Sequence, residues 1–139
     1  MSSRVHVTQT YRSDPATVFA ALAEHENLGP VFGAKITRMR DGDASRNGVG
    51  SVRRLKIGPL PAFEETTTVA EEPTLIEYRI TRGSPLRNHH GVQRLSPTPD
   101  GGTRLDYTIT FDAVVPGLDK VVAAVLTRAI SRGLPKLVP

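Results

Sequence analysis

The amino-acid sequence predicts an α+β fold in which a strongly curved, seven-stranded antiparallel sheet wraps around a long C-terminal helix, with two short helices after strand 1. Three observations support this prediction. Residues 34–113 alternate between apolar and polar side chains, which is the period of a β-strand. Turn-forming residues interrupt the alternation at short intervals, which favours antiparallel hairpins. Residues 118–129 instead carry apolar side chains three and four positions apart, the spacing of an amphipathic helix.

The N-terminal segment is expected to form the first strand and the two short helices. Residues 5–12 alternate weakly and predict a strand. Asp14 can cap the helix that follows, and Pro15 suits its first turn, where a backbone N–H has no helical acceptor. The apolar side chains of this helix share one face: Val18, Phe19, Leu22 and Ala23. Gly29-Pro30 then interrupts the helix and leaves one further helical turn around residues 28–32.

Six more strands are predicted between this region and the last helix. They cover residues 35–40, 50–57, 63–69, 75–81, 88–95 and 103–113. The segments between most of them contain Gly, Pro or Asp, as hairpin turns require. Successive strands joined by such short connections form an antiparallel meander.

The C-terminal helix is predicted to begin at Pro116 and to end at Gly133 and Pro135. Its apolar positions are Leu118, Val121, Val122, Val125, Leu126 and Ala129. A sheet and one apolar helix bury their apolar faces against each other. Strong curvature of the sheet would leave an apolar pocket between the two layers.

Composition excludes several classes of site and partner. The 139 residues predict a single domain, 1–139, and the absence of cysteine excludes thiolate metal ligands and cysteine nucleophiles. No metal site or cofactor is predicted, because neither metal-ligand spacing nor a phosphate-binding glycine motif is present. The net charge of +4 comes from arginines interspersed with acidic residues, so no nucleic-acid partner is expected. Without a signal peptide or a membrane-spanning apolar run, the predicted location is cytoplasmic.

Several short segments, taken in order, resemble the START/Bet v 1-like superfamily, also called SRPBCC or polyketide cyclase/dehydrase-like. They are residues 14–19, 49–53, 71–73 with Tyr78, 101–103, and the terminal helix. The resemblance covers almost the whole chain. It implies a helix-grip fold with a cavity for hydrophobic ligands such as lipids, and it includes relatives with cyclase, aromatase or dehydratase chemistry.

Two loops are also similar to the gate and latch of the plant abscisic acid receptors. The gate-like segment is residues 58–62, with Leu60 at its tip, and the latch-like segment is residues 84–88. This similarity implies two loops that close over a ligand. The hormone-binding lysine has no counterpart here, and Ser84-Pro85 replaces the latch His-Arg pair, so hormone recognition is not implied.

Strand parity predicts which side chains face the pocket, because neighbouring residues of a strand point to opposite sides of the sheet. Together with the loops and the last helix, the expected ligand-binding residues are Arg53, Leu55, Ile57, Leu60, Glu65, Thr67, Tyr78, Ile80, Leu86, His89, Gln93, Tyr107, Ile109, Val122, Val125 and Leu126. Buried polar groups need partners. Arg53 and Glu65 can satisfy one another as an internal ion pair; alternatively, the polar groups meet a ligand or take part in catalysis.

Three functions remain open from the sequence. The first is binding of a lipophilic or aromatic small molecule in the cavity, gated by the two loops. The second is cyclase- or dehydratase-type acid–base chemistry, with His89 or Glu65 as the base and Arg53, Tyr78 or Tyr107 as a donor to the enolate. The third is a ligand-dependent protein partner at the gate loop.

Overall fold

The computed structural model describes residues 2–58 and 61–139, and within them one antiparallel sheet has seven strands. Its order is β1-β7-β6-β5-β4-β3-β2, so the first and last strands pair. The strands are β1 (Ser2–Tyr11), β2 (Lys35–Arg40), β3 (Val52–Lys56), β4 (Phe63–Glu71), β5 (Leu75–Arg82), β6 (Leu86–Pro97) and β7 (Thr103–Ala113). The helices are α1 (Pro15–Ala23), α2 (Gly29–Phe32) and α3 (Leu118–Gly133), with 3-10 turns η1 (His25–Leu28) and η2 (Leu134–Lys136).

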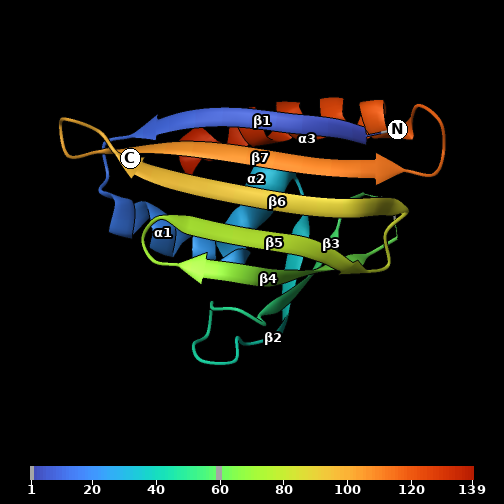
Figure 1. The fold of residues 1–139 in the computed structure, drawn as a ribbon, viewed down its shortest axis with the longest axis horizontal. Helices are drawn as coiled ribbons and strands as arrows, with labels where there is room; N and C mark the ends of the chain where they lie inside the picture. Colours follow the sequence, from blue (N-terminus) through green and yellow to red (C-terminus); the bar gives the residue numbers. More distant parts are fainter. Residues whose placement is uncertain (1, 59–60) are drawn as a thin grey trace.

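All helices lie on one side of the sheet, behind it in Figure 1, and β2 and β3 turn toward that side. The predicted fold is therefore confirmed: a curved antiparallel sheet holds the C-terminal helix, the helix-grip arrangement. Strand parity also holds in β7, whose apolar side chains are buried in alternation. These side chains are Leu105, Tyr107, Ile109 and Phe111.

The start of β6 differs from the prediction. The strand begins at Leu86, so Leu86 and Arg87 already pair with β7. Asn88 has a φ of 52°, and the register shifts between Arg87 and His90. The segment 84–88 is therefore not a loop throughout, as the latch comparison predicted, but in large part a bulged strand start.

Helix starts follow local backbone chemistry. The Asp14 carboxylate accepts a hydrogen bond from the Thr17 backbone N–H at 3.0 Å, so the predicted N-cap of α1 is confirmed. The predicted start of α3 at Pro116 was wrong. Gly117 has a φ of 84°, a left-handed conformation that cannot continue a right-handed helix, and α3 begins only at Leu118.

Two side-chain hydrogen bonds attach α3 and the η2 turn that follows it to the edge strand β1. The Ser3 hydroxyl donates to the Asp119 carboxylate at 2.6 Å, and the Tyr11 hydroxyl donates to the Leu134 carbonyl oxygen at 2.7 Å. Near its C-terminal end α3 approaches α2 so closely that a Cβ on Gly133 would lie 2.4 Å from the α2 backbone. The helix is thus fixed over one part of the concave face, which sets the position of the cavity beside it.

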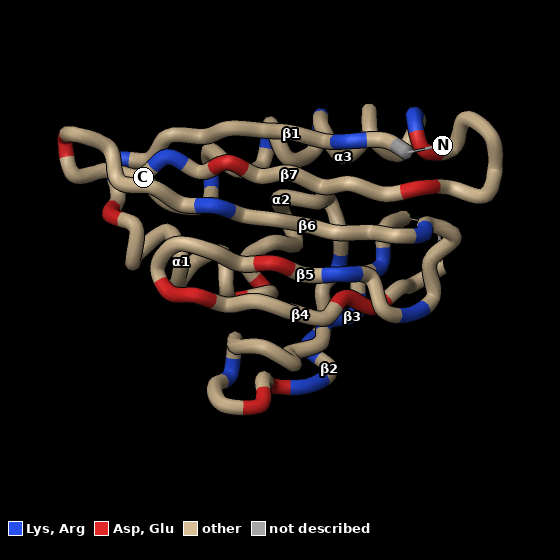
Figure 2. Tube along the Cα trace, viewed as in Figure 1, with Lys and Arg blue, Asp and Glu red and all other residues tan. Residues whose placement is uncertain are grey.

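Charged residues of both signs are spread over the strands (Figure 2). On exposed positions some form ion pairs, such as Arg54–Glu64 at 3.1 Å and Arg104–Asp106 at 3.2 Å. Exposed pairs of this kind contribute about 0–1 kcal/mol each to stability. Among the described residues, no helix combines the length and apolar character needed to cross a membrane.

Candidate functional site

A mainly apolar cavity of about 220 Å³ lies between the concave face of the sheet and α3. From α3, side chains four residues apart reach the cavity on one face of the helix: Leu118, Val122 and Leu126. Strands β3 to β7 supply Leu55, Phe63, Glu65, Tyr78, Ile80, Leu86, His89 and Ile109. Phe32 of α2 and the loop residues Ile57, Pro61, Ser84 and Pro85 complete the lining. Its surface is therefore almost entirely hydrocarbon.

Glu65 is the charged side chain of this lining, and it is held by a buried ion pair. Arg53 Nε and Nη2 both lie 3.0 Å from Glu65 Oε1, so the internal pair expected from the sequence is present. The two residues are opposite each other in the β3–β4 register. Burial raises the pKa of Glu65, and the neighbouring Arg53 charge opposes that rise.

Arg53 lies behind the cavity wall rather than in it. Its Nη1 is 3.1 Å from His25 Nε2 and donates to Thr67 Oγ1 at 3.2 Å. Its guanidinium group lies over the Tyr78 ring, 4.7 Å from the ring centre. The arginine is therefore fully engaged by protein groups, with only 4% of its side chain exposed.

His89 is a hydrogen-bond donor toward the cavity. Its Nδ1 accepts the Ile80 backbone N–H at 3.0 Å, which leaves the proton of the neutral ring on Nε2. Burial, reinforced by the Arg53 charge, lowers the pKa of His89 to about 3. This arrangement disfavours His89 as a base, because the nitrogen that would take up a proton, Nδ1, already accepts a hydrogen bond from the Ile80 backbone.

The lowered pKa of His89 predicts a pH dependence of stability. Below pH 6.5 the unfolded chain takes up a proton that the folded chain accepts only near pH 3, so the free energy of unfolding falls as the pH falls through this window. Above pH 6.5 this contribution is fully present. In His89→Asn, whose Oδ1 stands at the position of Nδ1 and can still accept from the Ile80 N–H, the slope between about pH 6 and pH 5 should be smaller by about 1 kcal/mol per pH unit. Urea unfolding at a series of pH values measures it, and an unchanged slope would contradict the assignment.

Two buried tyrosines lie next to the ion pair. The hydroxyl groups of Tyr78 and Tyr107 are hydrogen-bonded to each other, and their rings meet edge to face with centres 6.4 Å apart. Burial raises the pKa of both phenols, so both stay protonated. Tyr78 reaches the cavity, whereas Tyr107 does not line it.

Comparison with known proteins identifies the family. Residues 2–139 match the family model described as polyketide cyclase / dehydrase and lipid transport. The chain belongs to this family. It is thereby a member of the SRPBCC/Bet v 1-like superfamily, as the short motifs indicated. No curated protein sequence matches it.

Solved structures share the fold at low sequence identity. Ara h 8.0201 is 16% identical with a TM-score of 0.68, and the match covers 98% of this chain and 97% of that one. The Zhui aromatase/cyclase from Streptomyces sp. R1128 is 20% identical with a TM-score of 0.68, covering 99% and 84%. A protein from Nitrosospira multiformis is 15% identical with a TM-score of 0.71, covering 95% and 93%. At these identities the likeness concerns the fold alone.

The structure brings ten of the predicted residues to the cavity of this family member. They are Leu55, Ile57, Glu65, Tyr78, Ile80, Leu86, His89, Ile109, Val122 and Leu126. Arg53, Thr67, Gln93 and Tyr107 are buried behind the wall. Leu60 lies outside the described residues. Val125 does not line the cavity: it lies at the edge of the cavity-facing stripe of α3, about 60° around the helix from Val122, and it is 58% exposed.

Six lining residues were missed: Phe32, Pro61, Phe63, Ser84, Pro85 and Leu118. Leu118 carried a usable signal, since it precedes Val122 by one helical turn. Phe63 also carried a signal, because it shares the parity of Glu65 in β4. Pro61, Ser84 and Pro85 belong to the two segments predicted to gate the pocket, although these residues were not named individually. Phe32 lines the cavity through the meeting of segments distant in sequence, which strand parity does not address.

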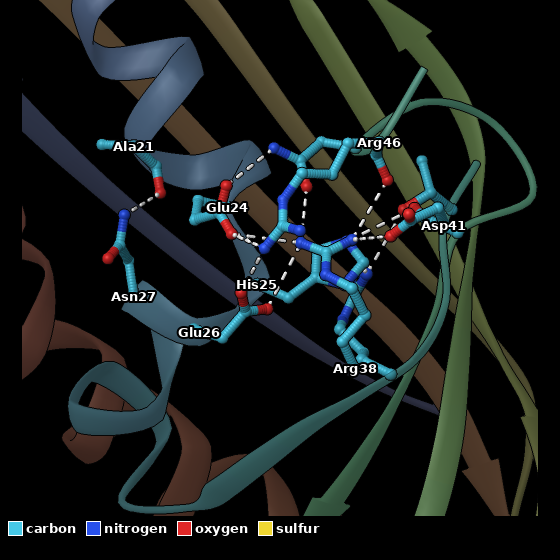
Figure 3. A network of polar contacts seen from close by, with 12 residues as sticks. Ala21, Glu24, His25, Glu26, Asn27, Arg38, Asp41 and Arg46 are labelled. Carbon is cyan, nitrogen blue, oxygen red and sulfur yellow. Dashed lines mark hydrogen bonds and ion pairs between the residues drawn. The ribbon is translucent and has the colours of Figure 1, made fainter. Parts of the chain in front are cut away.

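A second polar network closes the end of the molecule near β2 (Figure 3). Glu24 Oε1 lies 2.8 Å from Arg46 Nη2 and 3.2 Å from Arg38 Nη2, and Arg46 Nη2 is 3.0 Å from Glu26 Oε2. These contacts hold the η1 turn against the β2–β3 connection. His25, only 2% exposed, lies in the same turn and links the network to Arg53. The network thus supports the buried polar cluster from behind.

Proposed function

We propose that the protein binds a lipophilic or aromatic small molecule in the cavity between the sheet and α3. The observation that carries this proposal is the lining: it is hydrocarbon on nearly all sides, and Glu65, Tyr78 and His89 are the strand residues in it that carry polar groups. Burial of apolar ligand surface supplies affinity at about 25 cal/mol per Å². The polar groups set the orientation of the ligand.

The cavity volume limits the size of the ligand. A dry apolar cavity of about 150 Å³ accommodates a benzene molecule. At about 220 Å³, the present cavity suits a bicyclic aromatic or a chain of similar bulk without rearrangement. A larger ligand requires the surrounding loops to move.

The segments 58–62 and 84–88 are proposed to gate the cavity. Pro61, Ser84 and Pro85 line it. Gly83, which precedes the second segment, packs against Ala62 of the first, since a Cβ on Gly83 would lie 2.8 Å from the Ala62 carbonyl oxygen. Glycine permits this approach because it has no Cβ, and it also tolerates the φ of 85° found there. A protein partner at the gate is a further expectation for the same surface.

A thermal-shift screen tests the binding proposal. The panel contains polyketides, quinones, fatty alcohols and fatty acids. A compound at 100 times its dissociation constant should raise the free energy of unfolding by about 2.7 kcal/mol. The absence of any shift over the panel, at concentrations that saturate comparable pockets, would contradict the proposal.

Cyclase- or dehydratase-type chemistry is the second candidate, and the position of Glu65 favours it. Its carboxylate would remove a proton from the carbon next to a ligand carbonyl, and the C–H electron pair would pass into an enolate. His89 Nε2–H would donate to the enolate oxygen. Glu65, then protonated, would return the proton to a carbon or to a departing hydroxyl. Turnover that Glu65→Gln abolishes while binding persists would support this candidate.

A further inference from the structure

The charges around the cavity are asymmetric. Within the described residues, its lining includes one carboxyl group, from Glu65, and no Lys or Arg side chain. The nearby cation, Arg53, lies behind the Tyr78 ring and donates to Glu65 and Thr67. A ligand carboxylate would therefore meet a carboxyl group and no free cation.

The histidine at the cavity does not change this balance. His89 binds the Ile80 backbone N–H through Nδ1, so it offers a neutral N–H from Nε2. Becoming a cation would require a proton on Nδ1 and therefore the loss of that backbone hydrogen bond. Its lowered pKa is consistent with a ring that stays neutral at physiological pH.

Glu65 and His89 flank the same residue of β5. Glu65 is opposite Ile80 in the β4–β5 register, and His89 binds the Ile80 backbone from β6. Neighbouring strands lie about 4.8 Å apart, so the backbones of the two residues are separated by two such spacings, roughly 10 Å. One acceptor and one donor thus line the cavity from the two strands on either side of β5.

Resting on the proposed binding function, we propose that the cavity selects uncharged ligands, with a hydroxyl that donates to Glu65 and a carbonyl that accepts from His89, and that it excludes carboxylates. Burying an unpaired carboxylate costs several kcal/mol, so an acid must either stay outside or bind in its protonated form. A free fatty acid or an aromatic acid is then a poor ligand, whereas the corresponding ketone or alcohol is a good one.

Three bicyclic probes of similar size test this selection. Acetonaphthone is neutral with a carbonyl, hydroxyacetonaphthone adds a hydroxyl, and naphthoate carries a carboxylate. Isothermal titration of the wild-type protein at neutral pH should rank hydroxyacetonaphthone first and naphthoate last, with naphthoate weaker than acetonaphthone by roughly tenfold or more. Equal or tighter binding of naphthoate would overturn the inference.

Glu65→Gln provides a second test, because it removes the carboxylate and leaves the Arg53 charge uncompensated. The penalty for naphthoate relative to acetonaphthone should shrink to about threefold or less, or reverse. Glu64→Gln is the matched control, since Glu64 directly precedes Glu65 in β4, points to the other face and pairs with Arg54. A penalty that responds equally to both variants would contradict the role of Glu65.

Ligand binding in the cavity and selection against carboxylates are tested separately by these probes. If neither neutral probe binds the wild-type protein, the binding function itself is wrong, and the inference falls with it. If the neutral probes bind and naphthoate binds as well as they do, the binding function stands and only the selection against carboxylates is wrong. The wild-type ranking needs no variant, so poor folding of Glu65→Gln does not prevent this decision.

Discussion

Arg53→Met is expected to lower the free energy of unfolding by about 3–5 kcal/mol, the effect of leaving a buried carboxylate without its counter-charge. Arg53 supplies both 3.0 Å contacts to Glu65 and also holds His25 and Thr67. Methionine fills a similar volume but donates no hydrogen bond. Urea unfolding at neutral pH, followed by circular dichroism, measures the loss.

The next residue of the same strand offers a matched control. Arg54 forms a pair of similar length with Glu64 at 3.1 Å, but its side chain is 50% exposed. Arg54→Met should therefore cost no more than about 1 kcal/mol. Combining Arg53→Met with Glu65→Leu should recover part of the lost stability, since the orphaned charge is then gone. An equal decrease in the free energy of unfolding in Arg53→Met and Arg54→Met would contradict the larger contribution expected from the buried pair.

Val122→Trp is expected to abolish ligand binding while the fold persists. Val122 lines the cavity from α3, and an indole in its place would occupy most of the roughly 220 Å³ of free volume. The dissociation constant of acetonaphthone should rise by about a hundredfold or more, which corresponds to the loss of about 2.7 kcal/mol of binding free energy. Titration calorimetry measures the affinity, and thermal unfolding checks that the variant is folded.

Val125→Trp is the control on the same helix, because Val125 is 58% exposed and does not line the cavity. Its ligand affinity should match that of the wild type within about twofold. If Val125→Trp weakened binding and Val122→Trp did not, the ligand would bind on the outer side of α3 and not in the cavity.

Much of the fold was accessible from sequence because local signals agreed with tertiary structure. The alternation of apolar and polar residues up to Phe111 predicted a strand with one buried face, and β7 has that burial pattern. Asp14 before Pro15 predicted a helix N-cap, and its carboxylate caps α1. The polar core was also accessible in part. Arg53 and Glu65 share an inward parity on adjacent strands, so their ion pair followed from the hairpin register.

The rest of the site depends on how the helices and strands pack together, which the spacing of apolar residues along the sequence does not reveal. Val122 and Val125 are equally apolar and belong to the same helical pattern, and only the docking of α3 on β1 and α2 separates the lining residue from the exposed one. Likewise, strand parity placed His89 inside, but its backbone partner, Ile80, is visible only in three dimensions. The bond from Ile80 occupies Nδ1 and leaves the ring proton on Nε2, so His89 is available as a hydrogen-bond donor and not as the base considered from the sequence.

Methyl NMR on Ile, Leu and Val residues, titrated with acetonaphthone, tests most directly whether the cavity is the binding site. Aromatic ring currents shift nearby methyl signals strongly. If the ligand occupies the cavity, we expect large shifts for Ile80, Ile109 and Val122, which line it, and none for Val121 and Val125, which are 60% and 58% exposed. Shifts confined to Val121 and Val125, with the cavity methyl groups unchanged at saturation, would contradict it.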